Sequence, residues 1–183
     1  MRIALIILLV SGICFADPGA SSDYVFKDLG GVSREPLKPG DKLASVLIFY
    51  WQDCPISNGY APELNRIAAS HTNFAFYIVQ VDPELTATAA KEHAREYALH
   101  LPVLLDPKHH LVDRLKATVT PEAVVVGKNA QVLYRGRIDD RYAALENKRA
   151  AITRHDLIDA LDAIANGTLV KEKETKAIGC LIQ

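Results

Sequence analysis

The sequence predicts an α/β protein with three layers, in which helices cover both faces of a central mixed β-sheet. Apolar runs typical of buried strands alternate along the chain with amphipathic segments of helical spacing, and this alternation is typical of a layered sheet. Residues 122–126 and 131–136 are two apolar runs joined by the short turn Gly-Lys-Asn-Ala, which predicts an antiparallel hairpin at one edge. The 183 residues suffice for one such domain.

The central stretch is residues 45–64, S-V-L-I-F-Y-W-Q-D-C-P-I-S-N-G-Y-A-P-E-L. Its first part, residues 46–51, is rich in β-branched and aromatic side chains and predicts a buried strand. Beyond Cys54 and Pro55, apolar residues recur at helical spacing. Proline suits the first turn of a helix because its missing N–H would have no partner there. Cys54 is therefore expected where a strand ends and a helix begins.

Turn residues and apolar spacing divide the rest of the chain into further elements. Thr86 or Thr88 is a candidate cap for the second helix. Thr153 is expected to open the last helix with Asp156 in an approximate capping box, and Gly167 is expected to end it. The expected strands are residues 24–29, 73–81, 102–105, 122–126 and 131–136, and the further helices are residues 86–99, 111–115 and 153–166.

The first residues have the pattern of a secretory signal peptide. Arg2 is followed by an apolar run over residues 3–15, and the small Ala16 precedes Asp17, so we expect cleavage after Ala16. A lipoprotein signal acylated at Cys14 and an uncleaved anchor are the alternatives. The chain then divides into a signal peptide (1–16), one domain (17–167) and a tail (168–183). The mature protein is expected to be exported, periplasmic or extracellular, with no stable membrane insertion.

The net charge and the positions of the histidines bear on two classes of function. The formal net charge of −1 gives no reason to expect a nucleic-acid partner. The histidines show no metal-ligand spacing, and we expect neither a metal nor a cofactor; those considered are His93, His100, His109, His110 and His155.

Removal of the signal peptide leaves two cysteines, Cys54 and Cys180. An even pair in an oxidising compartment suggests a disulfide, and a single pair is too sparse to be a structural framework for a domain of this size. At a helix start, free N–H groups and the helix dipole favour a thiolate at Cys54, whereas the neighbouring Asp53 opposes it. Cys180 is either a spare tail thiol or, given its apolar surroundings, a docked partner of Cys54.

Three features, taken in order, resemble the thioredoxin fold and, within it, the redoxin family of alkyl hydroperoxide reductase and thiol-specific antioxidant type. Cys54 lies in C-P-I-S at the place of the family's C-x-x-C nucleophile, Pro62 follows eight residues later, and Thr120-Pro121 precedes the hairpin. The motifs D-L-G-G at residues 28–31 and Y-R-G-R at residues 134–137 are also similar to the family. The resemblance covers about residues 24–167.

The resemblance implies roles for particular residues. Cys54 would be the nucleophile, and the Thr120–Pro121 bond would be cis, in a loop that exposes backbone groups to a bound peptide. Ser57 stands in place of the second C-x-x-C cysteine, where it could hydrogen-bond the thiolate. Because the hairpin leaves Pro121 and returns at residues 134–137, Arg137 is expected at the same end of the sheet, where it either supports the thiolate or is a solvated surface charge. Because Ser57 is no thiol, resolution would fall to Cys180 or to an external thiol.

We therefore expect an exported thiol–disulfide oxidoreductase that acts on a protein thiol or disulfide client, or with a small thiol donor. Two other functions stay open. A thiol peroxidase of peroxiredoxin type is the first, although the motif P-x-x-x-T-x-x-C would need Pro at Leu47 and Thr at Trp51. A non-enzymatic copper-handling or client-binding module is the second, although Asn58 stands where copper-chaperone relatives have a second cysteine.

Overall fold

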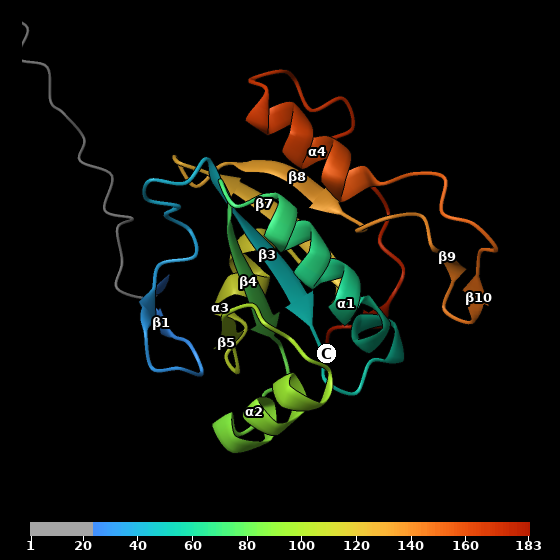
Figure 1. The fold of residues 1–183 in the computed structure, drawn as a ribbon. Helices are drawn as coiled ribbons and strands as arrows, with labels where there is room; N and C mark the ends of the chain where they lie inside the picture. The colour runs from blue at the N-terminus through green and yellow to red at the C-terminus, as the bar shows by residue number, and fades with distance from the viewer. Residues whose placement is uncertain (1–23) are drawn as a thin grey trace, which may run out of the picture.

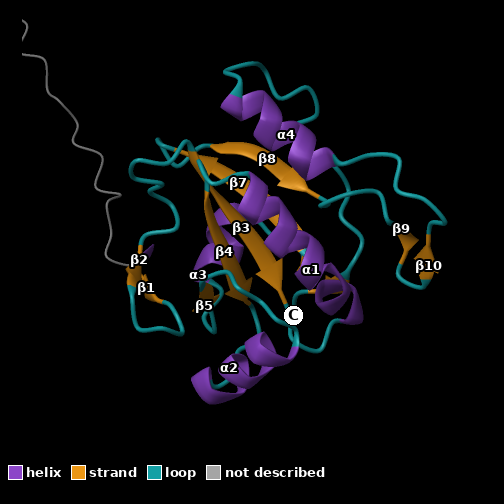
Figure 2. Cartoon of the chain, viewed as in Figure 1, coloured by secondary structure: helices purple, strands orange, loops and turns teal. Residues whose placement is uncertain are grey.

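A computed structural model describes residues 24–183, so the expected signal peptide, with its alternative at Cys14, lies outside the described residues. A five-stranded sheet with the strand order β5-β4-β3-β7-β8 forms the centre (Figures 1 and 2). Its strands are β3 (Ala44–Tyr50), β4 (Ala75–Gln80), β5 (Val103–Leu105), β7 (Glu122–Gly127) and β8 (Val132–Gly136). β3, β4 and β5 run parallel, whereas β7 and β8 are antiparallel to their neighbours, which confirms the expected mixed sheet and edge hairpin.

Side chains of the central strand alternate between two hydrophobic cores, as the pleat of a strand requires. Val46 and Ile48 pack beneath α1 and α4 on one face, and Leu47 and Phe49 pack against α3 on the other. All four side chains are fully buried. The helices are α1 (Pro55–Ser70), α2 (Ala87–Glu96), α3 (His110–Leu115) and α4 (Asp156–Ala165). The three-layer arrangement predicted from the sequence is confirmed.

The ends of two helices test the expected caps. Thr86 caps α2, since its hydroxyl accepts a hydrogen bond from the backbone N–H of Ala89 at 3.2 Å. Thr153 does not open the last helix, which begins at Asp156, so the expected capping box is wrong. Thr153 instead donates from its hydroxyl and its backbone N–H to the carboxylate of Asp140, at 2.6 and 2.8 Å. These hydrogen bonds hold the pKa of Asp140 below its usual range.

The N-terminal part of the described chain forms a small hairpin rather than the single expected strand. Strand β1 (Phe26–Lys27) pairs with β2 (Ser33–Arg34), and Gly30 and Gly31 lie in the turn between them. Asp28 fixes this turn, because the N–H groups of Gly30 and Val32 both donate to its carboxylate at 2.9 Å.

Two hairpin strands between β8 and α4 had no signal in the sequence. They are β9 (Tyr142–Ala144) and β10 (Asn147–Lys148), and they extend to one side of the sheet (Figures 1 and 2). The strands are short and mostly exposed, so no apolar alternation predicts them.

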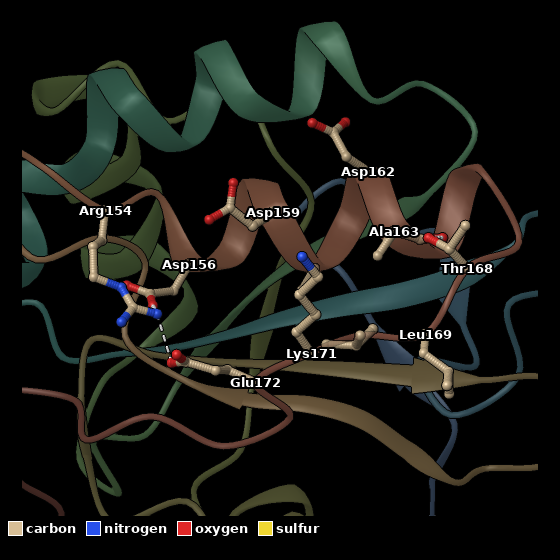
Figure 3. Close-up of a pocket in the computed structure, with 11 residues that line it drawn as sticks. Arg154, Asp156, Asp159, Asp162, Ala163, Thr168, Leu169, Lys171 and Glu172 are labelled. Carbon is tan, nitrogen blue, oxygen red and sulfur yellow. Dashed lines mark hydrogen bonds and ion pairs between the residues drawn. The ribbon is translucent and has the colours of Figure 1, made fainter.

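The tail after α4 docks onto the domain over much of its length. At its start it lies beside α4, where Arg154 pairs with both Asp156 and Glu172 at 2.8 and 2.5 Å (Figure 3). It then follows the edge of β8: the N–H of Arg135 donates to the carbonyl oxygen of Lys173 at 2.8 Å. Backbone hydrogen bonds therefore hold the polar part of the tail to the domain as well as its apolar end.

Candidate redox site at the start of helix α1

Cys54 lies at the junction between β3 and α1. It is the N-cap residue of α1, with extended backbone angles, and Pro55 follows in the first turn. The residue is fully buried. The unpaired N–H groups of a first helical turn and the helix dipole stabilise negative charge at this position. The sequence-based placement of Cys54 at a helix start is confirmed.

A disulfide joins Cys54 to Cys180, with a Cα–Cα distance of 6.1 Å across a sequence separation of 126 residues. This distance lies in the range that disulfides usually span. The two cysteines left after the expected signal cleavage are thus a pair in the structure. Cys180 is only partly buried, whereas Cys54 beneath it is inaccessible.

The tail reaches Cys54 as a short strand. Strand β11 (Cys180–Leu181) pairs antiparallel with β6 (Val119–Thr120), and Cys180 lies opposite Thr120. The N–H of Ile182 extends this pairing by donating to the carbonyl oxygen of Thr118 at 3.1 Å. The tail therefore occupies backbone groups that would otherwise be free at the edge of β6.

The loop after β6 adjoins the same sulfur. The Thr120–Pro121 peptide bond is cis, as expected. The carbonyl oxygen of Thr120 lies 3.1 Å from the sulfur of Cys54. After reduction, an S–H group at Cys54 would have a hydrogen-bond acceptor here, which favours the protonated thiol. This effect opposes the stabilisation of the thiolate by the start of α1. Thr120 and Pro121 thus lie beside both cysteines. Their role in binding a client is part of the proposals below.

Ser57 and Arg137, the two residues expected to support the thiolate, lie in different surroundings. Ser57 is fully buried one turn into α1, and its hydroxyl has no hydrogen-bond partner among residues 24–183. The guanidinium of Arg137 pairs with Asp156 at 2.7 Å, and this hydrogen bond raises the pKa of Arg137. No hydrogen bond or ion pair within the described part of the chain joins Arg137 to Cys54.

A polar network behind Cys54 was missed by sequence reasoning. Asn58 lies one turn after Cys54, and its side-chain oxygen accepts from the hydroxyl of Tyr50 at 2.9 Å and lies 3.0 Å from a ring nitrogen of His93. Its amide donates to the carbonyl oxygen of Gln52 at 2.8 Å. Burial lowers the pKa of His93, which favours the neutral ring. The spacing of four residues between Cys54 and Asn58 was the one available signal.

A second polar cluster links α1 to the segment after β8. The hydroxyl of Tyr60 donates to Asp139 at 2.5 Å, and Arg141 pairs with Asp139 at 3.2 Å while its guanidinium lies 4.5 Å from the centre of the Tyr60 ring. Burial, together with the hydrogen bond to Asp139, raises the pKa of Tyr60. No sequence pattern connects residues so far apart.

A pocket of about 280 Å³ lies between the domain and the end of the tail. One wall comes from the chain around Trp51 and the loop after β4, and the other comes from the end of the tail. The lining residues are Trp51, Val81, Asp82, Pro83, Glu84, Leu181, Ile182 and Gln183.

Within residues 24–183, no group of three His, Cys, Asp or Glu side chains is arranged to hold a metal ion. None of the helices there is long and apolar enough to cross a membrane. A soft-metal site on the two cysteines would first require reduction of their disulfide, because only thiolates are such ligands.

The fold and the site together define a thioredoxin-like protein in which a cysteine at the start of α1, Cys54, is joined to Cys180 of the tail. The family model described as the AhpC/TSA family matches residues 37–135, which is more than half of the chain. The chain therefore belongs to the AhpC/TSA family. The search of curated proteins found no match.

Solved structures share the fold. An uncharacterized conserved protein from Geobacillus kaustophilus is 26% identical, covering 87% of each chain with a TM-score of 0.75. A hypothetical protein from Sinorhizobium meliloti is 24% identical, covering 87% of this chain and 89% of its own, with a TM-score of 0.70. A secreted Mycobacterium tuberculosis disulfide oxidoreductase homologous to E. coli DsbE is 19% identical, covering 77% of this chain and 96% of its own, with a TM-score of 0.56.

Proposed function

We propose that the protein is an exported thiol–disulfide oxidoreductase whose redox couple is Cys54 and Cys180. One observation carries this proposal: the two cysteines form a disulfide at a helix start, against the cis-proline loop. The family match and the likeness to a secreted disulfide oxidoreductase support it. The cysteines are too few to be a framework for the fold, which favours a redox use of the pair.

In the direction of client reduction, the Cys54 thiolate attacks one sulfur of a client disulfide. A Cys54–client disulfide forms, and the second client sulfur leaves as a thiolate. The Cys180 thiolate then attacks the sulfur of Cys54 and releases the first client sulfur as a thiolate. Two electrons pass from the cysteine pair to the client, and the Cys54–Cys180 disulfide is the oxidised product.

The oxidised pair is reduced again by two thiols from a small thiol donor or a protein dithiol. Cys54 is fully buried beneath the tail, while Cys180 is partly exposed, so the incoming thiolate attacks the sulfur of Cys180. The leaving group is then Cys54, whose thiolate is stabilised by the start of α1. A second thiol attacks the mixed disulfide on Cys180, which frees Cys180 and yields the oxidised donor.

Export is part of this proposal. Disulfides persist in oxidising compartments, and the pattern of residues 1–16 is that of a signal peptide. Mass analysis of the protein isolated from its producing cells tests it: we expect a mature chain that begins at Asp17. An intact Met1 or a lipid on Cys14 would overturn it.

A thiol peroxidase is the second candidate, and membership of the AhpC/TSA family favours it. In that reaction the Cys54 thiolate attacks a peroxide oxygen, the O–O bond breaks to release an alcohol or water, and Cys54 becomes a sulfenic acid. Cys180 would condense with it, release water and give the same disulfide. Leu47 is fully buried in β3, and Leu47 and Trp51 replace the proline and threonine of the peroxiredoxin motif.

A trapping experiment tests the proposal and separates the two candidates. Cys180→Ser lacks the resolving thiol, so on treatment with a protein disulfide such as insulin it should accumulate a Cys54–insulin adduct. The wild-type chain should instead turn over, and Cys54→Ser should do neither. A Cys180→Ser chain that ignores insulin and is converted by hydrogen peroxide to a sulfenic acid would replace the proposal with the peroxidase.

A further inference from the structure

The last residues of the chain bind the domain as an extended peptide would. The backbone of Cys180 pairs with Thr120, and the N–H of Ile182 donates to Thr118 at 3.1 Å. Side chains of an extended strand alternate in direction. Cys180 and Ile182 accordingly pack against the domain, on its two cores, while Leu181 between them is 70% exposed.

The same alternation continues before the cysteine. Ile178 packs against the core and lines a small recess beside Tyr60 and Pro121. Three alternate positions of the tail, those of Ile178, Cys180 and Ile182, therefore meet the domain, with the cysteine in the middle.

Gly179 is the closest point of approach. A Cβ atom built on it would collide with the carbonyl group of Thr120 and lie 3.1 Å from the backbone nitrogen of Pro121. These are backbone atoms, which cannot turn aside as a flexible side chain can. Only glycine therefore fits at the position before the bound cysteine.

We propose that this surface is a receptor for an extended client segment of the pattern aliphatic-Gly-Cys-x-aliphatic, and that the tail is its resident occupant. The inference rests on the proposed function, because the client sulfur must exchange with Cys54. The surface consists of the edge of β6, the recess beside Pro121 and the wall that Trp51 and residues 81–84 give to the neighbouring pocket.

The end of the tail can leave this surface while an earlier part of the tail stays bound to the domain. Residues 173–175 stay anchored on β8 through Arg135, whose N–H donates to Lys173 and whose carbonyl oxygen accepts from Thr175 at 2.9 Å. The hydroxyl of Thr175 also lies 2.7 Å from that of Tyr134. After reduction, only residues 176–183 need to swing away, so a client and the tail compete for one site at a high local tail concentration.

Peptide capture on the full-length Cys180→Ser chain tests the preference. The chain is equilibrated with reduced and oxidised glutathione and a heptapeptide of the sequence of residues 177–183, AIGCLIQ. Intact mass then gives the ratio of peptide adduct to glutathione adduct on Cys54. We expect AIGCLIQ to exceed both AIACLIQ and AIGCLSQ about tenfold in this ratio. Equal ratios for the three peptides would overturn the receptor while leaving the proposed function intact.

The absence of every adduct, including that of glutathione, would instead overturn the proposed function and this inference with it. Competition by the tail has its own test. Adding Gly179→Ala to the Cys180→Ser chain should loosen the tail and raise capture of AIGCLIQ, whereas adding Lys176→Ala, at an exposed position of the same segment, should not. Equal capture by both double variants would show that the tail does not occupy the client's site.

Discussion

Cys180 lies directly opposite Thr120 in an antiparallel strand pair, so the tail approaches Cys54 along a fixed line. The same Thr120 offers its carbonyl oxygen to the sulfur of Cys54 at 3.1 Å. One backbone position therefore aligns both sulfurs of the disulfide. Backbone pairing, rather than chance collision of a free tail thiol, thus brings Cys180 to Cys54 across 126 residues of chain.

The first prediction concerns the two halves of the reaction. Cys54→Ser should abolish insulin reduction while the fold is kept, because serine nearly matches the size of the cysteine. Cys180→Ser should keep the first step, adduct formation on Cys54, and lose turnover. The measurement is insulin reduction together with circular dichroism of each variant. Full activity of Cys54→Ser would show that the nucleophile has been assigned wrongly.

The second prediction concerns stability. The disulfide closes a loop over most of the described chain, and in the chain-entropy model a loop of this length stabilises a fold by about 4 to 5 kcal/mol. Urea unfolding with and without a reductant should show a midpoint that falls on reduction. The Cys54→Ser chain serves as the control, because its midpoint should not respond to the reductant. Equal midpoints for the oxidised and reduced wild-type chain would contradict the prediction.

The third prediction concerns Arg137. Because its guanidinium pairs with the buried Asp156, Arg137→Met should destabilise the protein by about 1 to 3 kcal/mol. Arg154 also pairs with Asp156, which limits the loss. The rate at which iodoacetamide alkylates the reduced Cys54 should change less than about threefold, since this guanidinium is engaged elsewhere. A much larger fall in that rate would support the thiolate-stabilising role expected from the sequence.

The fourth prediction concerns pH. Burial lowers the pKa of His93 below its ordinary value of 6.5, so the unfolded chain binds a proton there more readily than the folded protein does. Stability should therefore fall as the pH drops below about 6.5 and level off below the folded pKa. In His93→Gln, this part of the pH dependence should be missing from urea unfolding series. If the change in the free energy of unfolding between about pH 7 and pH 5 is the same in His93→Gln as in the wild-type chain, the prediction is contradicted.

Local chemistry is what the sequence could predict. The position of Cys54 follows from an apolar run, a proline and helical spacing within a short stretch, and all of these are visible in the chain. The cap at Thr86 could be predicted because its hydrogen bond spans only three residues. The Cys54–Cys180 disulfide could be predicted because so few cysteines allow few possible pairings.

Contacts between distant segments account for what the sequence could not predict. Thr153 looked like a helix cap, but Asp140, brought near by the fold, takes both its hydroxyl and its N–H. The cluster of Tyr60, Asp139 and Arg141 joins segments about eighty residues apart, as the separation of 79 between Tyr60 and Asp139 shows. Backbone hydrogen bonds hold the polar part of the tail, and backbone groups leave no mark in a pattern of side chains.

The most direct test of the Cys54–Cys180 couple is peptide mapping of the mature protein after equilibration in glutathione buffers of graded redox poise. We predict one linked pair of peptides, containing Cys54 and Cys180, whose amount falls as the buffer becomes more reducing and returns when it is reoxidised. Two free thiols under oxidising conditions, or linkage only between separate molecules through Cys180, would contradict it.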